Sequence, residues 1–138
     1  MPYMSAKTGS AILLAVAVAI FAFGFTYNKI EDRDRLRERA AATVGGDPSR
    51  GEAMFIQYGC GSCHQLRHVR KATGMVGPPL DGIADQETVA GKLSNSPENL
   101  QLWIRSPQEV NPGTAMPDLH VGAEDARDIS AFLYTRTS

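Results

Sequence analysis

The stretch Cys60-Gly61-Ser62-Cys63-His64 places two thiols three residues apart, with an imidazole directly after the second thiol. This C-x-x-C-H spacing is typical of the covalent attachment of a c-type haem. One helical turn matches the separation of the two vinyl groups of a haem, so each thiol can add to one of them. The imidazole of the next residue then lies beneath the iron. We therefore predict that Cys60 and Cys63 bind one covalent haem c and that His64 is its proximal iron ligand.

Other cysteine chemistries fit this chain less well. A thioredoxin-like redox pair needs a βαβ context, which the flanking sequence does not show. A structural zinc site needs two further ligands nearby. Two cysteines in 138 residues cannot form a disulfide-rich scaffold. The formal net charge of −1 also argues against a nucleic-acid partner, which requires a clustered basic surface.

A six-coordinate haem needs a second axial ligand from another part of the chain. The candidate side chains are Met54, Met75, Met116, His68 and His120. Met116 lies in the segment 112–117, Pro-Gly-Thr-Ala-Met-Pro, where glycine and two prolines favour a rigid extended loop. Methionine ligation also raises the reduction potential of a haem. We predict that Met116 is the distal ligand, that Met54 packs in an amphipathic helix, and that both histidines lie at the surface.

The rest of the soluble part is predicted to be helical. Asp47 and Pro48 favour the start of a helix that runs over residues 49–58. Ser96 caps a second helix by the same logic, and Pro107 ends it. A third helix is expected at about residues 123–135, with acidic residues in its first turn. No stretch is typical of a strand, so the predicted fold class is all-α.

The N-terminal part of the chain differs sharply from the rest. Thr8 to Asn28 are 21 residues without a charge. As a helix they rise roughly 31 Å, which matches the ~30 Å hydrocarbon core of a bilayer. A cleaved signal peptide is the alternative, but the apolar run is long for a signal core. We predict a single transmembrane anchor (1–28), a charged helical stalk with a Gly-Gly linker (29–46), and a haem domain (47–138).

Residues 48–138 resemble a class I cytochrome c domain. The matching pieces are Gly51 with Phe55, the C-x-x-C-H run, Gly77-Pro78-Pro79-Leu80, Gly91, the Trp103 region, Met116-Pro117 and the last helix. The segments 97–107 and 112–117 are also similar to cytochrome c domains fused to subunit two of some haem–copper oxidases. This chain departs from that fused form, because it has one apolar span and no copper-binding domain.

The resemblance implies roles for further residues. A proline carbonyl, here that of Pro78, would accept the second N–H of the His64 ring, and Pro79 and Leu80 would pack on the haem. Trp103 would donate its indole N–H to a haem propionate. The alternatives are a proline turn without haem contact and an ordinary core tryptophan. The first and last helices would cross where Gly51 permits close approach, with Phe55 and Phe132 filling the contact.

The resemblance also implies the function. We expect a single-pass, membrane-anchored mono-haem cytochrome c that transfers single electrons and is not itself an enzyme. It would act in a bacterial respiratory or photosynthetic chain, between an upstream cytochrome or quinol-oxidising complex and a terminal oxidase. The alternative is an integral haem c subunit that relays electrons inside a larger oxidase or quinol-oxidising complex. An enzyme or gas sensor with an open iron site is a further rival.

The expected orientation in the bacterial cytoplasmic membrane rests on two conflicting signals. Only Lys7 precedes the apolar span, whereas five Lys or Arg residues follow it before Gly45. The positive-inside rule alone would therefore place the C-terminal side in the cytoplasm. Haem attachment in the resembling family takes place outside the cytoplasm. Because a domain on the wrong side would receive no haem, we expect a cytoplasmic N-terminus and a periplasmic haem domain.

Overall fold

The computed structural model describes residues 6–137 of the chain, so the first residues of the predicted anchor lie outside the described part. The chain divides into two compact units, one that ends at Arg35 and one that begins at Leu36. This division falls between the boundaries that the sequence predicts after residues 28 and 46, and those finer boundaries stay predictions. The two units are described separately.

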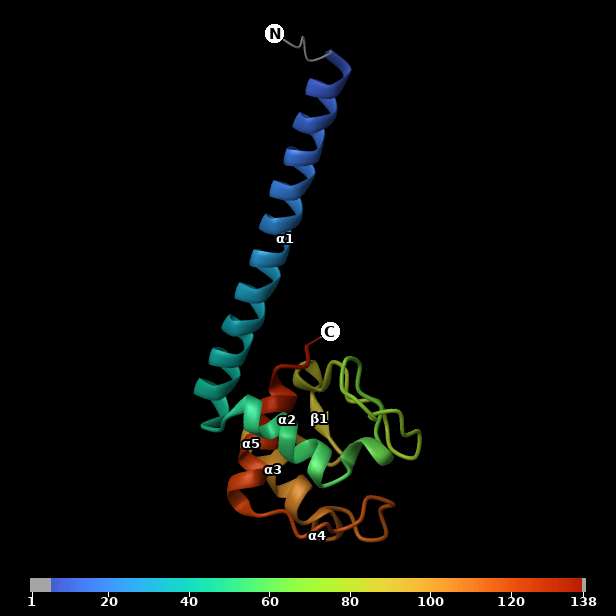
Figure 1. Ribbon diagram of the computed structural model, residues 1–138. Helices are drawn as coiled ribbons and strands as arrows, with labels where there is room; N and C mark the ends of the chain where they lie inside the picture. Colours follow the sequence, from blue (N-terminus) through green and yellow to red (C-terminus); the bar gives the residue numbers. More distant parts are fainter. Residues whose placement is uncertain (1–5, 138) are drawn as a thin grey trace. The chain divides into compact units, whose positions relative to one another are not determined.

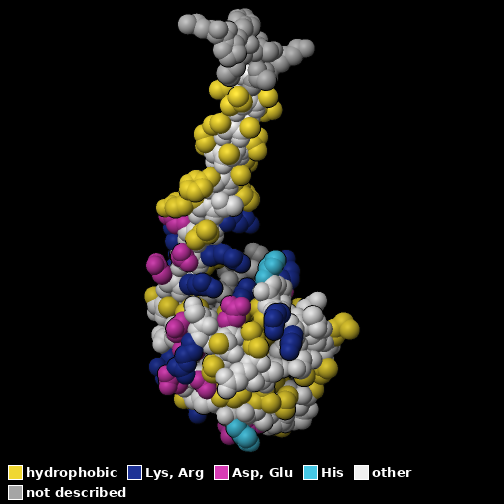
Figure 2. Space-filling view, in the orientation of Figure 1, with side chains coloured by type: hydrophobic (Ala, Val, Ile, Leu, Met, Phe, Trp, Pro, Cys, Tyr) yellow, Lys and Arg dark blue, Asp and Glu magenta, His cyan; other side chains and the backbone are white. Residues whose placement is uncertain are grey.

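The first unit consists of the helix α1, which runs from Ala6 to Val44 and continues into the second unit (Figure 1). Its most apolar stretch has a mean hydropathy of 2.2 and is not buried against other parts of the protein. Figure 2 shows apolar side chains along the visible face of this stretch. Phe21, for example, is 76% exposed. A helix of this length and composition is a candidate membrane span.

The charged part of α1 continues the apolar part as the same helix. Arg35 and Glu31 form an ion pair of 2.5 Å one turn apart, at the predicted i, i+4 spacing. Such exposed pairs stabilise a helix by about 0.3–0.5 kcal/mol. The pair therefore supports a solvated helical segment after the apolar stretch.

Gly46 and Asp47, which follow the end of α1, contact the last helix of the second unit. Gly45 ends α1 in the left-handed conformation, with φ +76°, which is typical of the residue after a helix. A Cβ on Gly46 would lie 2.6 Å from the carbonyl oxygen of Arg127. The backbone N–H of Asp47 also donates to Oδ1 of Asp128 at 2.8 Å. Gly46 and Asp47 are thus held against α5 (Ala123–Tyr134).

The helices α2 (Pro48–Gln57) and α5 cross in close contact (Figure 1). The carboxylate of Asp47 accepts from the N–H groups of the first turn of α2, as predicted. A Cβ on Gly51 would lie 1.9 Å from the carbonyl oxygen of Asp128, so only glycine fits here. The rings of Phe55 and Phe132 pack beside this point with their centroids 5.7 Å apart. The predicted crossing of the first and last helices of the domain is confirmed.

An ionic cluster joins the same two helices at the start of α5. Arg50 pairs with Glu124, with Asp125 at 2.6 Å and with Asp128 at 3.1 Å. The Tyr58 hydroxyl donates to Asp125 at 2.8 Å. This hydrogen bond and the pairing with Arg50 lower the pKa of Asp125 below its usual range. The carboxylates also lie near the positive end of α5, where negative charge is favoured.

The other helices are short and surround the site. They are the 3₁₀ turns η1 (Cys60–Ser62) and η2 (Ile83–Asp85), α3 (Pro97–Arg105) and α4 (Pro107–Val110). Ser96 caps α3 by accepting from the N–H of Asn99, as predicted. Leu100 and Ile104 form its buried stripe. Pro107 follows the end of α3 as expected, and it also begins α4.

The structure contains a small hairpin that the sequence does not predict. The strand β1 (Thr88–Val89) pairs antiparallel with β2 (Leu93–Ser94). Ala90 and Gly91 both have positive φ values, 56° and 62°, and the N–H of Lys92 donates to the carbonyl of Val89. These features are typical of a type I′ turn. Strands of two residues are too short to show an alternating pattern, and alanine is unusual in the left-handed position. Apart from this hairpin and an isolated antiparallel bridge between Gln65 and Thr73, the regular secondary structure of the described residues is helical.

Replacing Gly51 by alanine should destabilise the domain by about 3 kcal/mol or more, because the new methyl group overlaps the backbone of α5. The measurement is guanidinium unfolding of the full-length protein in detergent, followed by the fluorescence of Trp103, the single tryptophan. Ala53→Gly is the matched control, since Ala53 is exposed on the same helix. It should cost only the loss of helix propensity, about 1 kcal/mol. An unchanged midpoint for Gly51→Ala would contradict the close crossing.

Candidate haem site

A cavity of about 680 Å³ lies in the second unit. Its volume falls within the range of cofactor sites. Its walls come from α2, the segment 58–64, the loop 76–80, the hairpin, α3, the loop 111–121 and α5. Every residue predicted for the site lines this one cavity: Cys60, Cys63, His64, Pro78, Pro79, Leu80, Trp103 and Met116. Segments more than 50 residues apart in sequence therefore meet around one space.

The two cysteines are placed by a single tight turn. Gly59 leaves α2 in the left-handed conformation, with φ +72°. The N–H groups of Cys63 and His64 then both donate to the carbonyl of Cys60, at 3.2 and 2.9 Å. Both thiols are free and half-buried. Burial raises the pKa of Cys60 to about 11, so its thiol is neutral at physiological pH.

The His64 ring is held in a defined orientation. Its Nδ1 lies 2.8 Å from the carbonyl oxygen of Pro78. Because a carbonyl can only accept, Nδ1 donates this hydrogen bond, and the tautomer that fits the contact leaves the lone pair on Nε2. A metal-binding histidine requires this second hydrogen bond to fix its tautomer and orientation. The Nε2 atom is therefore the ring nitrogen that can bind a metal.

Gly77 allows the proline loop to reach the imidazole. A Cβ at this position would lie 2.4 Å from Cε1 of the His64 ring. The N–H of Gly77 donates to the carbonyl of Cys63 at 2.9 Å, and the N–H of Leu80 donates to that of Gln65 at the same distance. These two bonds fasten the loop 77–80 on both sides of His64.

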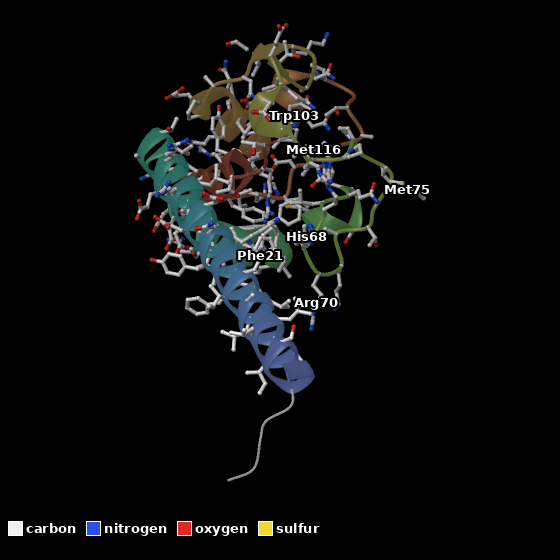
Figure 3. The ribbon with its side chains drawn as sticks, turned by 90° about the horizontal axis from the view of Figure 1, so that it is seen from above. Phe21, His68, Arg70, Met75, Trp103 and Met116 are labelled. Carbon is white, nitrogen blue, oxygen red and sulfur yellow. The ribbon has the colours of Figure 1, made fainter. Side chains whose placement is uncertain are left out.

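Met116 lines the cavity from the loop 111–121, which is distant in sequence from His64. The N–H of Thr114 donates to the carbonyl of Asn111 at 3.1 Å, and Gly113 has a φ of +84°. With Pro112 before the glycine, these features are typical of a type II turn. Met116 is half-buried, and Figure 3 shows it and Trp103 within the same part of the domain.

The other candidates for a distal ligand lie elsewhere, since none of them lines the cavity. Met75 is 89% exposed and lies at the outer edge of its loop (Figure 3). His68 and His120 are exposed, as predicted, and His120 lies 3.4 Å from the carboxylate of Asp118. Met54 is half-buried against the hydrophobic core, which fits its predicted packing role.

The sequence alone predicts no role for two residues near the site, Gly77 and Gln108. Gly77 lies in one of the segments that resemble a class I cytochrome c, but its contact with the His64 ring arises only in the folded loop. Gln108 hydrogen-bonds the backbone of the Met116 loop. A glutamine followed by a Pro-Gly turn hints at such a contact, but no spacing rule predicts it.

The cavity fits a haem on its own chemistry. Two thiols, an imidazole with an available nitrogen and a thioether border a space whose remaining lining is mainly apolar, with residues such as Val89, Leu100 and Ile129. A flat, largely apolar macrocycle with a central iron that binds histidine and methionine matches this combination of groups. The ligand atoms and the apolar lining of the cavity therefore both fit a haem.

The chain is similar to oxidase subunits of Alkalihalophilus and Bacillus species. It is 33% identical to cytochrome c oxidase subunit 2 of Alkalihalophilus pseudofirmus over 86 residues, which are 62% of this chain and 24% of that protein. The same subunit of Bacillus sp. strain PS3 is 36% identical over 83 residues, 57% of this chain and 23% of the relative. That of Bacillus subtilis is 25% identical over 88 residues, 62% of this chain and 25% of the relative. The chain thus spans about a quarter of the length of these relatives.

No solved structure gives a significant match. The family model described as Cytochrome c matches residues 48–137, which comprise all of α2 through α5 and every residue of the candidate site. The match covers most of the chain, and the helical architecture around the cavity agrees with it. The chain therefore belongs to the cytochrome c family.

Proposed function

We propose that this protein is a membrane-anchored mono-haem cytochrome c that transfers single electrons in a bacterial respiratory chain and delivers them to a terminal oxidase. One observation carries the proposal. The two cysteines, the histidine with an available Nε2 and Met116 border a single apolar cavity. The similarity to cytochrome c oxidase subunit 2 supports the respiratory context.

Each site residue has a role in this proposal. Cys60 and Cys63 would hold the haem through two thioether bonds. His64 and Met116 would bind its iron. The bound haem supplies the one-electron Fe(II)/Fe(III) couple. Pro78 orients the His64 ring through its carbonyl group, and this contact also makes the imidazole a stronger electron donor.

The other residues that line the cavity raise the reduction potential of the Fe(II)/Fe(III) couple and keep water away from it. The apolar walls, which include Pro79 and Leu80, exclude water and lower the local dielectric constant. A low dielectric disfavours the oxidised iron, which carries the greater charge, and so raises the reduction potential. A thioether ligand acts in the same direction. Trp103 donates its indole N–H to a haem propionate in this assignment, because a largely buried tryptophan needs a polar partner.

The proposed ligation makes the protein a carrier. With His64 and Met116 at the two axial positions, no position at the iron is left for a substrate. The runner-up is an integral haem c subunit that relays electrons inside a larger oxidase or quinol-oxidising complex. The relatives support this second candidate, an integral subunit, because the matching proteins are themselves named as oxidase subunits.

The membrane assignment completes the proposal. The apolar stretch of α1 anchors the protein in the cytoplasmic membrane. The haem domain lies on the periplasmic or extracytoplasmic side, because haem attachment in this family takes place there. The excess of cations after the span opposes this orientation, but the positive-inside rule is a statistical bias, whereas attachment is a strict requirement.

Met116→Ala should leave the haem attached and open the sixth axial position. The reduction potential should fall, and the reduced protein should bind carbon monoxide. The methionine–iron charge-transfer band of the oxidised protein should disappear. These three readouts test the proposed ligation and the closed iron site together.

Met54→Leu and Met75→Leu are the matched controls, since neither methionine lines the cavity. Both variants should keep the band, the potential and the resistance to carbon monoxide. A charge-transfer band that survives in Met116→Ala would refute the ligand assignment. Carbon monoxide binding to the unaltered protein would favour an enzyme or a gas sensor with an open iron site.

Isolation of the native protein in mild detergent distinguishes a carrier from a subunit. A carrier should separate from the oxidase during chromatography at moderate salt, because its contacts with partners are transient. A stable subunit should instead co-purify at a fixed ratio to the oxidase haems. Co-purification at a fixed ratio would replace the proposed function by the runner-up.

A reporter fused after Ser138 tests the orientation. Alkaline phosphatase folds only in an oxidising compartment, because it needs disulfides. A fusion with the full chain should therefore be active, and a β-galactosidase fusion at the same position should not. The reverse pattern would place the C-terminal domain in the cytoplasm, as the cation count alone predicts.

A further inference from the structure

Gln108 makes an unusual set of contacts for an exposed side chain. It lies in the first turn of α4 (Pro107–Val110). Its Nε2 donates to the carbonyl oxygens of Thr114 and Met116, both at 2.9 Å. Its Oε1 accepts from the N–H of Gly113 at 3.2 Å. All three hydrogen bonds therefore end on the backbone of residues 113–116, the loop that carries Met116.

The chemistry of these partners requires a primary amide. Two carbonyl oxygens need two N–H donors, and the N–H of Gly113 needs an acceptor. Turning the amide over would place its oxygen against two other oxygens, so the orientation is fixed. A glutamate of the same length has no donor at neutral pH, and an asparagine is one methylene too short. Among the common side chains, only glutamine satisfies all three groups from this position.

The short helix α4, which carries Gln108, is held in place by a buried proline and by backbone hydrogen bonds. Pro107, the preceding residue, is among the most completely buried side chains of the domain. The N–H of Ser106 donates to the carbonyl of Leu102 in α3, and the N–H of Asn111 donates to that of Pro107, each at 2.9 Å. The short helix α4 is thus joined directly to α3, which carries Trp103 into the same cavity.

Few hydrogen bonds within the Met116 loop stabilise its conformation. The turn bond between Thr114 and Asn111 closes one end of the loop. Within the loop, the N–H of Met116 lies 3.4 Å from the Thr114 hydroxyl, which is a long contact. The bonds from Gln108 add a connection at three points, one of them to the carbonyl of Met116 itself.

We propose that Gln108 is a positioning residue for Met116. Its amide joins the loop to α4 and holds it in the conformation that points the thioether into the cavity. It thereby sets how firmly the sixth axial position is closed to competing ligands. This inference rests on the proposed function of Met116 as the distal ligand, and it adds a residue that touches neither the cavity nor the iron.

The test measures how easily an external ligand displaces Met116. Imidazole is titrated into the oxidised full-length holoprotein in detergent, and binding is followed in the visible spectrum. Gln108→Glu removes both donors at nearly constant size, and Gln108→Ala removes all three bonds without adding charge. Both variants should raise the association constant for imidazole about tenfold, as the loss of two or three ordinary hydrogen bonds predicts. The reduction potential should fall toward that of Met116→Ala.

Gln57→Glu is the matched control, because Gln57 is exposed in α2 and does not line the cavity. It should leave the imidazole constant and the potential unchanged. Amide hydrogen exchange gives an independent readout. The N–H of Gly113 should lose protection in Gln108→Ala, while the N–H of Leu100 in α3 should keep it.

The outcomes distinguish a failure of the role of Gln108 from a failure of the proposed ligation by Met116. If the Gln108 variants change only the unfolding midpoint and leave imidazole binding at the control value, Gln108 is merely structural and the inference fails. Met116→Ala then still tests the proposed function by itself. If Met116→Ala also leaves imidazole binding unchanged, the distal ligation fails, and the role of Gln108 fails with it.

Discussion

The backbone of α2 lies directly against the backbone of α5 at Gly51, with no room for even one methyl group between them. Much of the domain depends on this contact. Phe55, on the next turn of α2, packs on Phe132 and also lines the cavity. Ile129 and Leu133 line the same cavity from α5. Because α2 leads within three residues to Cys60, the crossing also sets where the attachment turn begins.

The parts of this structure that could be predicted from sequence are those with short-range causes. Asp47 and Ser96 each cap a helix within three residues of their own position, so a local pattern is sufficient to place α2 and α3. The spacing of Cys60, Cys63 and His64 is similarly local. The meeting of these residues with Met116 was predictable only through the resemblance to a family, since no local rule spans that distance.

The features that escaped prediction depend on contacts between distant segments. The sequence predicts a Gly-Gly linker but says nothing of its partners, and Gly46 and Asp47 contact Arg127 and Asp128. The hairpin 88–94 places Ala90 in a conformation that a sequence rule assigns to glycine or asparagine. Tertiary context overrides propensity at such positions.

The two faces of the candidate site are built in different ways, and the difference has a physical consequence. His64 is held within the 19 residues from Cys60 to Pro78, by the turn at Cys60 and by the carbonyl of Pro78. Met116 instead lies in a loop whose hydrogen bonds come from Gln108 in another element. The two thiols lie beside His64 and not in that loop. Under the proposed ligation, changes in the Met116 loop should therefore alter the reduction potential without disturbing haem attachment.

The charge of the haem domain agrees with an anchored carrier. From Gly45 onward the sequence contains eight Lys or Arg residues and eleven Asp or Glu residues. A diffusing carrier that seeks an acidic partner needs a basic face to raise its association rate, and this domain has a net acidic charge instead. A membrane anchor removes that need, because tethering replaces a three-dimensional search by a high effective concentration. Under this constraint the docking surface is free to be selected for electron transfer after contact, and long-range attraction is no longer required.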